Sequence, residues 1–298
     1  MPMNSENYWK EFRDKLSELG ALKGGIIYVG SDITGLIVQA QKELGIKTRD
    51  ERNAYINELI DALKEQVTEE GTLLFPVYSW DFCRGKGFDI RKTQGEVGAL
   101  NNFVLNERSD FRRTKHPIYS FMVWGRDADL LCDMNNQEAW GPASPFKYLH
   151  ENNAIELDLN VTALRSMTFK HYVEQSVRVP YRYPKYFMGR YTDENGITEE
   201  RTYSMYVRDL SVELESSQTN EFFNAGGAGK QVLFRNLNLY AIDLGRAYEL
   251  LKDDLLTNNG RNVYSFENYT IDWNDTAARY EIGFWKDKKI VSIPEGIE

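Results

Sequence analysis

The strongest constraint on the fold of this chain is the alternation of short apolar runs with helical segments in its first half. The runs GGIIYVGSD, GTLLFPVYSW and YSFMVWG (119–125) have the length and composition of buried strands. Between the first two, residues 51–67 place apolar side chains at 56, 59, 60, 63 and 67, which is the spacing of one helix face. Strands separated by helices predict an α/β fold in which helices cover a sheet.

The remaining pattern predicts further elements in one domain. We expect helices over 5–19, with Ser5 as the N-cap and Gly20 as the stop, and over 34–44. The run AIELDLNV (154–161) alternates apolar and polar residues, so it predicts a strand with one buried face and one polar face, which is either solvent-exposed or a cleft wall. Residues 184–210 indicate a hairpin that turns at Asn195–Gly196, and residues 231–256 indicate a strand followed by a helix.

The chain has no sign of a linker between domains, and its charge does not suggest nucleic-acid binding. No Pro/Gly/Ser-rich linker divides the chain, so we expect a single domain over 1–298, with a core α/β portion at 1–180 and a hairpin and strand–helix portion at 181–298. The net charge of -9 disfavours nucleic acid and anionic membranes as partners and favours cations, such as amino sugars.

The cysteines and the N-terminal residues indicate a cytoplasmic, soluble protein. Cys83 and Cys132 are too few for a disulfide framework and are expected to be reduced thiols. The start of the chain, MPMNSENYWKEF, lacks the basic and apolar regions of a signal peptide. No apolar run approaches the ~18 residues that a membrane span needs.

The segment SMTFKHYVEQ (166–175) holds one of only three histidines in the chain. Thr168 or Ser166 can cap a helix that runs to about Arg178, with His171 and Glu174 on a face away from its buried stripe. Positions i and i+3 are neighbours on a helix, so Glu174 can orient the imidazole of His171. The spacing leaves two interpretations open, a general base or an ordinary surface residue.

Other motifs give weaker evidence of a function. GGAGK (226–230) lacks the spacing of a phosphate loop and predicts a loop before a strand. Three scattered histidines and two distant cysteines have no metal-ligand spacing, so we expect no metal. Cys83, in SWDFC, would be an acyl-carrying nucleophile only if His171 lay beside it. A free cysteine is more often a small buried hydrophobic residue.

Five segments taken together resemble a known family. They occur in the order EEGTLLFPVYSWDFC, FDIRKTQGEVGAL, RRTKHPIYSFMVWG, WGPASPF and TFKHYVEQSVRVPYR. This series resembles the antibiotic acetyltransferase family, best known for the aminoglycoside 3-N-acetyltransferases. The resemblance covers roughly residues 20–185, with a looser echo around 226–256. It implies a mixed central sheet flanked by helices and acetyl-CoA-dependent N-acetylation of an amino sugar.

The resemblance also implies roles for particular residues. The family pattern T-x-x-H-x-x-E falls on Thr168, His171 and Glu174, which makes His171 the general base. The residues implied on the coenzyme side are Ser31, Asp32, Ile33, His116, Pro117 and Thr168. The residues implied on the acceptor side are Trp80, Asp81, Asp89 and Glu96.

The implied mechanism is a direct transfer in a ternary complex. His171 takes a proton from the ammonium group, directly or through water, and the amine then adds to the thioester carbonyl. Backbone N–H groups in the loop after residues 25–30, or the Thr168 hydroxyl, are the candidates for oxyanion donors. Coenzyme A leaves as the thiolate.

Three departures from the family pattern affect these expectations. The family reads HSSL after its first strand where this chain has GSDI (30–33), so Gly30 replaces a histidine. The segment LDLNVTALRS lacks the family's glycines, and its backbone is expected to adopt positive φ less freely. The tyrosine-rich hairpin 186–208 has no counterpart in the pattern.

Two acceptors are left open, an aminoglycoside antibiotic and a nucleotide-linked amino sugar of surface-polysaccharide biosynthesis. The three departures fit the nucleotide-linked sugar better. A nucleotide diphosphate would need cationic side chains to bind it. The candidates in the sequence are Arg178, Arg182, Lys185 and Arg190. The alternative interpretation of this basic cluster is a solvent-exposed face without a ligand. A second interpretation, motivated by Gly30, is a catalytically inactive member that binds coenzyme or sugar. A homodimer is plausible on general grounds.

Overall fold

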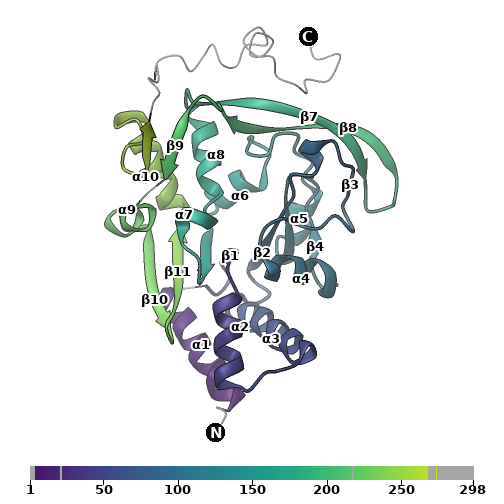
Figure 1. Ribbon diagram of the computed structural model, residues 1–298, viewed down its shortest axis with the longest axis vertical. Coiled ribbons are helices and arrows are strands. Elements are labelled where there is room, and N and C mark those ends of the chain that lie inside the picture. Colours follow the sequence, from purple (N-terminus) through teal and green to yellow (C-terminus); the bar gives the residue numbers. More distant parts are fainter. Residues whose placement is uncertain (1–3, 21, 217, 268–272, 274–298) are drawn as a thin grey trace.

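A seven-stranded mixed sheet forms the centre of the computed structural model, which describes residues 4–20, 22–216, 218–267 and 273 (Figure 1). The strand order is β10-β11-β6-β1-β2-β5-β4. β1 runs parallel to β2 and β6, whereas β5 and β11 run antiparallel to their neighbours β2 and β6. The strands are β1 Ile26–Ser31, β2 Thr72–Tyr78, β4 Arg112–Arg113, β5 Tyr119–Gly125, β6 Ile155–Leu159, β10 Gly229–Phe234 and β11 Leu237–Asp243. The expected α/β class with a mixed sheet is confirmed.

Helices cover both faces of this sheet. Along β1, Ile27 and Val29 pack into one apolar cluster and Ile26 and Tyr28 into the other, because successive side chains of a strand point to opposite faces. The first cluster includes residues of α1 Ser5–Leu19, α2 Thr34–Glu43, α3 Arg49–Val67 and α4 Ala99–Glu107. The second includes residues of α5 Ala128–Asp133, α6 Pro145–Glu151, α7 Ala163–Ser166, α8 Phe169–Ser176, α9 Thr219–Ala225 and α10 Leu244–Thr257. None of the helices in the described ranges is both long and apolar enough to cross a membrane.

Two local expectations need correction. Helix α1 is capped by Asn4, whose side chain accepts a hydrogen bond from the Glu6 N–H, so Ser5 is the first helical residue and not the cap. Residues 231–256 contain a two-stranded hairpin before helix α10, not a single strand. Arg235 adopts a φ of 58° at its turn, a left-handed conformation that the sequence pattern did not indicate.

The predicted hairpin forms a second sheet that extends over the top of the molecule in the view of Figure 1. It consists of β7 Arg182–Thr192 and β8 Thr198–Arg208, with β3 Phe88–Asp89 beside β7. Gly196 has a φ of 82° in the connection, which confirms the turn at Asn195–Gly196. A third small sheet pairs β9 Glu213–Ser216 with β12 Tyr264–Glu267.

Strand β6 has no solvent-exposed face. Glu156 and Asp158, expected on a polar face at solvent or a cleft wall, are both 0% exposed. The reason is topological, because β6 lies between β1 and β11 and helices cover both sides of the sheet. A strand at the centre of a covered sheet buries its polar side chains together with its apolar ones.

Candidate active site

His171 and Glu174 form the centre of the candidate site on helix α8. The His171 Nδ1 lies 2.6 Å from the Glu174 Oε2, the contact that i, i+3 spacing predicts. Glu174 is fully buried, although the sequence placed it on an outer face of the helix. Tyr181, which precedes β7, and Arg182, the first residue of β7, hold it there. Tyr181 donates a hydrogen bond of 2.8 Å to its Oε1, and the Arg182 Nε lies 2.8 Å from its Oε2.

The charges of this cluster set the protonation of the imidazole. Burial opposes ionisation of Glu174, but Arg182 and then His171 outweigh it and keep the pKa of Glu174 well below its usual range. Burial and the nearby Arg182 lower the pKa of His171 to about 4, against the opposing effect of Glu174. The ring is therefore neutral at pH 7. Since the carboxylate can only accept a hydrogen bond, Nδ1 carries the proton and Nε2 has the free lone pair.

Thr168 and Ser166 precede α8 without capping it through their side chains. Thr168 stands at the N-cap position with φ -64° and ψ -25° and makes no capping hydrogen bond through its side chain. The Tyr28 hydroxyl donates to the Ser166 carbonyl at 3.4 Å. The Ser166 hydroxyl donates to the Asp158 Oδ2 at 2.8 Å. Ser166 therefore ties the turn before α8 to the central strands β1 and β6.

A pocket of about 260 Å³ opens beside His171. The His171 side chain is 23% exposed, so one part of the ring is accessible while Nδ1 faces the buried Glu174. The lining residues are Leu164, Arg165, Met167, Thr168, Lys170, His171, Arg182, Arg208, Leu214, Ser216 and Tyr264. Trp140 packs edge-on against the imidazole, with 5.2 Å between the ring centroids.

The loop expected to hold the coenzyme follows the carboxyl end of β1. The Ser31 hydroxyl is buried and has no hydrogen-bond partner among the described residues. Asp32 accepts a hydrogen bond of 3.0 Å from the Thr34 N–H at the start of α2, and Ile33 is 4% exposed. Ligands of open α/β sheets bind at the carboxyl ends of the strands, which is where this loop lies.

The structure explains how the chain tolerates Gly30. A Cβ added at Gly30 would lie 2.2 Å from the Asp158 Oδ1 and 2.8 Å from the Ser166 Cβ. Asp158 and Ser166 therefore fill the space into which a side chain at position 30 would project. The glycine-poor segment after β6 still adopts positive φ, because Asn160 takes a φ of 55°. Asparagine tolerates the left-handed region better than most residues, so this position of the segment adopts positive φ without a glycine.

His116 and Pro117 lie in the interior, ahead of β5. His116 is 1% exposed, and its Nδ1 accepts hydrogen bonds from the N–H groups of Ile118 at 3.3 Å and Tyr119 at 3.1 Å. Burial lowers the pKa of His116 to about 3. These contacts stabilise the turn into β5, and neither residue lines the pocket beside His171.

The carboxylates expected on the acceptor side are already paired. Asp81 lies 3.0 Å from Arg84 and 2.9 Å from Lys86, and Glu96 lies 3.0 Å from the same Arg84. Glu96 also accepts a hydrogen bond of 2.7 Å from the Trp80 N–H, which fixes the loop after β2. Each charge is thus compensated within its own loop.

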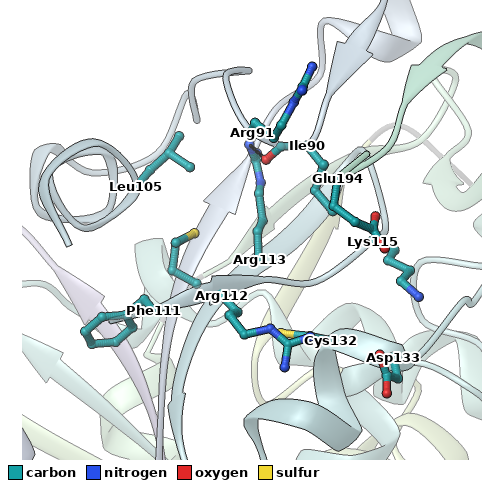
Figure 2. Close-up of a pocket in the computed structure, with 11 residues that line it drawn as sticks. Ile90, Arg91, Leu105, Phe111, Arg112, Arg113, Lys115, Cys132, Asp133 and Glu194 are labelled. Atoms are coloured by element: carbon teal, nitrogen blue, oxygen red, sulfur yellow. Dashed lines mark hydrogen bonds between the residues drawn. The ribbon is translucent and has the colours of Figure 1, made fainter. Parts of the chain in front are cut away.

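Asp89 belongs to a different region, around the pocket drawn in Figure 2. This pocket of about 290 Å³ is lined by apolar residues such as Leu105 and Phe111 and by several cations. Two of these cations are engaged by the protein. Arg91 pairs with Asp89 at 2.9 Å, and the buried Arg113 donates to backbone carbonyls, including that of Thr93 at 2.6 Å. The structure therefore does not bring Asp89 together with His171.

Two further sequence candidates are weakened by the structure. Burial raises the pKa of Cys83 to about 12, the opposite of what a nucleophilic thiolate requires. The expected basic cluster is not one cluster. Arg182 is buried against Glu174, whereas Arg190 stands eight residues further along β7, roughly 26 Å at ~3.3 Å per residue.

Sequence reasoning missed the most unusual side chains around the site. The buried pair Glu156 and Asp158 has its pKa values raised, above all by burial, to about 7 for Asp158. The cations Arg165, Lys170 and Arg208 meet at the pocket from three separate elements. The only sequence signal for the acidic pair is its polar positions in the otherwise apolar strand β6. No sequence pattern indicates that the three cations meet. Among the described residues, no group of histidine, cysteine, aspartate or glutamate is arranged to hold a metal ion.

Comparison with known proteins identifies relatives of this fold. The family model described as aminoglycoside 3-N-acetyltransferase matches residues 47–255. Aminoglycoside acetyltransferase AAC(3)-Xa superposes with a TM-score of 0.65 at 19% identity, over 82% of this chain and 92% of that one. AAC-IIIb in a binary complex with CoASH gives 0.63 at 18%, over 83% and 96%. The YokD protein from Bacillus subtilis gives 0.63 at 21%, over 82% and 97%. A comparison with curated proteins gives no match.

Proposed function

Because this chain belongs to the aminoglycoside 3-N-acetyltransferase family, we propose that it transfers an acetyl group from acetyl-CoA to the amine of an amino sugar, with His171 as general base. One observation carries the assignment. A neutral imidazole lines a pocket, and the buried carboxylate of Glu174 orients it from behind at 2.6 Å. That arrangement leaves the Nε2 lone pair free to accept a proton.

Proton removal is the first task of the site. An ammonium group has no lone pair, so it cannot attack a thioester until a base takes a proton. His171 accepts this proton at Nε2, directly or through a water molecule, and becomes an imidazolium. The negative charge of Glu174 stabilises that imidazolium, while Arg182 and Tyr181 keep the carboxylate ionised and in place.

Addition to the thioester requires donors at the carbonyl oxygen. Our candidates are the Thr168 hydroxyl and the backbone N–H groups of the loop 31–33, except that of Asp32, which donates to the Leu159 carbonyl at 2.9 Å. Both lie at the edge where β1 ends and α8 begins. Coenzyme A then leaves as the thiolate, which takes the second proton that the nitrogen gives up as the amide forms. Ser31, Asp32 and Ile33 are proposed to contact the coenzyme, and the unpartnered Ser31 hydroxyl is the most direct candidate.

The acceptor side is proposed to lie towards the loop after β2, which carries Trp80, Asp81 and Glu96. The raised pKa of Cys83 favours direct transfer between two bound substrates over an acyl-enzyme. We assign His116 and Pro117 to the support of β5, because both are buried. The whole chain is proposed to act as one domain, since strands from both halves share the central sheet.

The test is titration of the protein with acetyl-CoA by calorimetry, followed by thiol release with a panel of amino sugars. His171→Ala should lower turnover by at least ~100-fold, which is the usual contribution of a general base, and should leave acetyl-CoA affinity within about 2-fold of wild type. His150→Ala is the matched control, because His150 stacks on Tyr248 and does not line the pocket. Equal turnover in His171→Ala and wild type would overturn the assignment of the base. Acetyl-CoA binding without thiol release would favour a non-catalytic binding protein.

A further inference from the structure

The pocket beside His171 has a charge that proton transfer alone does not require. Its lining includes four cationic side chains and no carboxylate: Arg165, Lys170, Arg182 and Arg208 are the cations. Arg182 is compensated by Glu174 beneath the pocket. Within the described part of the chain, no carboxylate forms an ion pair with any of the other three.

These three cations are brought together by the fold. Arg165 comes from α7, Lys170 from α8 and Arg208 from the end of β8. The Lys170 Nζ donates to the Ser216 hydroxyl on β9 at 3.2 Å, and burial lowers the pKa of Lys170 despite the opposing charges of Glu174 and Glu156. Taking an ammonium group out of water is unfavourable unless an anion compensates it. The pocket thus holds positive charge that a ligand could neutralise.

Strand β9 keeps its own carboxylates away from this charge. Its side chains alternate, so that Leu214 and Ser216 line the pocket while Glu213 and Glu215 are exposed on the other face. The pocket is therefore cationic in a chain whose net charge is -9. In the pocket of Figure 2, Arg91 pairs with the carboxylate of Asp89. Beside His171, the Arg208 guanidinium donates to the Val212 carbonyl and Lys170 to the Ser216 hydroxyl, and both of these acceptors are uncharged.

We propose that the pocket binds the phosphate or carboxylate group of an anionic amine acceptor, and so places the acceptor's amine beside His171. The proposal rests on the proposed acetyl transfer and specifies its substrate class. A polycationic aminoglycoside would be repelled here, and the carboxylates that could attract it, Asp81 and Glu96, are paired with Arg84. The volume of about 260 Å³ accommodates one anionic group and part of a sugar ring.

The first experiment measures anion binding without turnover. Inorganic pyrophosphate is titrated into the full chain by calorimetry, with and without saturating coenzyme A. We expect pyrophosphate to bind, and to bind equally well when coenzyme A is present. In Arg165→Glu the affinity for pyrophosphate should fall at least ~10-fold, which corresponds to the loss of about one charge-assisted hydrogen bond. Lys10→Glu makes the same charge change on an exposed position of α1 and should bind like wild type. Absent binding, or equal binding in Arg165→Glu, would overturn the anion site. Binding that coenzyme A abolishes would assign the anion to the coenzyme and overturn the acceptor assignment.

The second experiment compares acetyl transfer to glucosamine and to glucosamine 6-phosphate. We expect a kcat/KM at least ~10-fold higher for the phosphorylated sugar. The ratio of the two kcat/KM values should fall to near one in Arg165→Glu and stay at the wild-type value in Lys10→Glu. A preference for a polycation such as kanamycin that Arg165→Glu does not alter would refute the anionic acceptor but retain acetyl transfer. Pyrophosphate binding without thiol release from any acceptor would instead retain the pocket and refute the proposed function.

Discussion

Replacing Glu174 with glutamine removes one charge from a buried cluster with almost no change in shape. The carboxylate contacts His171 Nδ1 at 2.6 Å, the Arg182 Nε at 2.8 Å and the Tyr181 hydroxyl at 2.8 Å. An amide oxygen can still face His171 and Arg182, and the Tyr181 hydroxyl can rotate to accept from the new NH₂ group. Hydrogen bonding is therefore largely kept, and the variant isolates the effect of charge.

The expected loss of stability follows from the burial of both partners. Glu174 is 0% exposed and Arg182 is 7% exposed, so the substitution leaves a buried guanidinium without its counter-ion. Breaking a buried ion pair on one side costs about 3–5 kcal/mol of unfolding free energy. Because the folded pKa of Glu174 is below its unfolded value, this contribution is fully present above pH ~4.3 and is lost only as the pH falls towards the folded pKa.

Urea unfolding at pH 7 measures this loss, and two further variants test its cause. Glu151→Gln, on the exposed end of α6, should change stability by less than ~0.5 kcal/mol. Glu174→Gln combined with Arg182→Met should recover part of the loss, since the uncompensated charge is then gone. A Glu174→Gln protein within ~0.5 kcal/mol of wild type would refute the reasoning. Turnover should also fall, by ~10–100-fold, because Glu174 no longer stabilises the His171 imidazolium.

Three other substitutions test separate parts of the structure. Burial raises the pKa of Asp158 to about 7, so the native protein loses stability as the pH rises from 4 towards that value. Asp158→Asn should therefore stabilise the protein increasingly over this range, by ~2–4 kcal/mol at pH 7. Urea midpoints of variant and wild type that run parallel from pH 4 to pH 7 would contradict this. Gly30→Ala should cost ~1–3 kcal/mol, because its Cβ would lie 2.2 Å from Asp158, and adding Asp158→Ala should restore most of the loss in thermal unfolding. Cys83→Ser should show normal thiol release, and a turnover below ~10% of wild type would reinstate a nucleophilic cysteine.

Local periodicity in the sequence was sufficient for most of the secondary structure. The stripe at 56, 59, 60, 63 and 67 predicts α3, and its side chains are buried as expected. The apolar runs predict β1, β2 and β5, and Asn195–Gly196 predicts the β7–β8 turn. Where the pattern was weaker it failed, as at the β10–β11 turn, because Arg235 in a left-handed conformation leaves no recognisable mark in the sequence.

The spacing of one helical turn also determined the contact between His171 and Glu174, since i and i+3 side chains are neighbours wherever the helix lies. Only the tertiary structure decided that Glu174 is buried, because that depends on the packing of Tyr181 and Arg182 against α8. The same holds for the acidic pair of β6 and for the cationic pocket. Burial and electrostatic potential depend on which elements meet in space, and Arg165 and Arg208 meet across more than forty residues of chain. Those long-range contacts, which no local pattern encodes, determine the charge of the pocket beside His171.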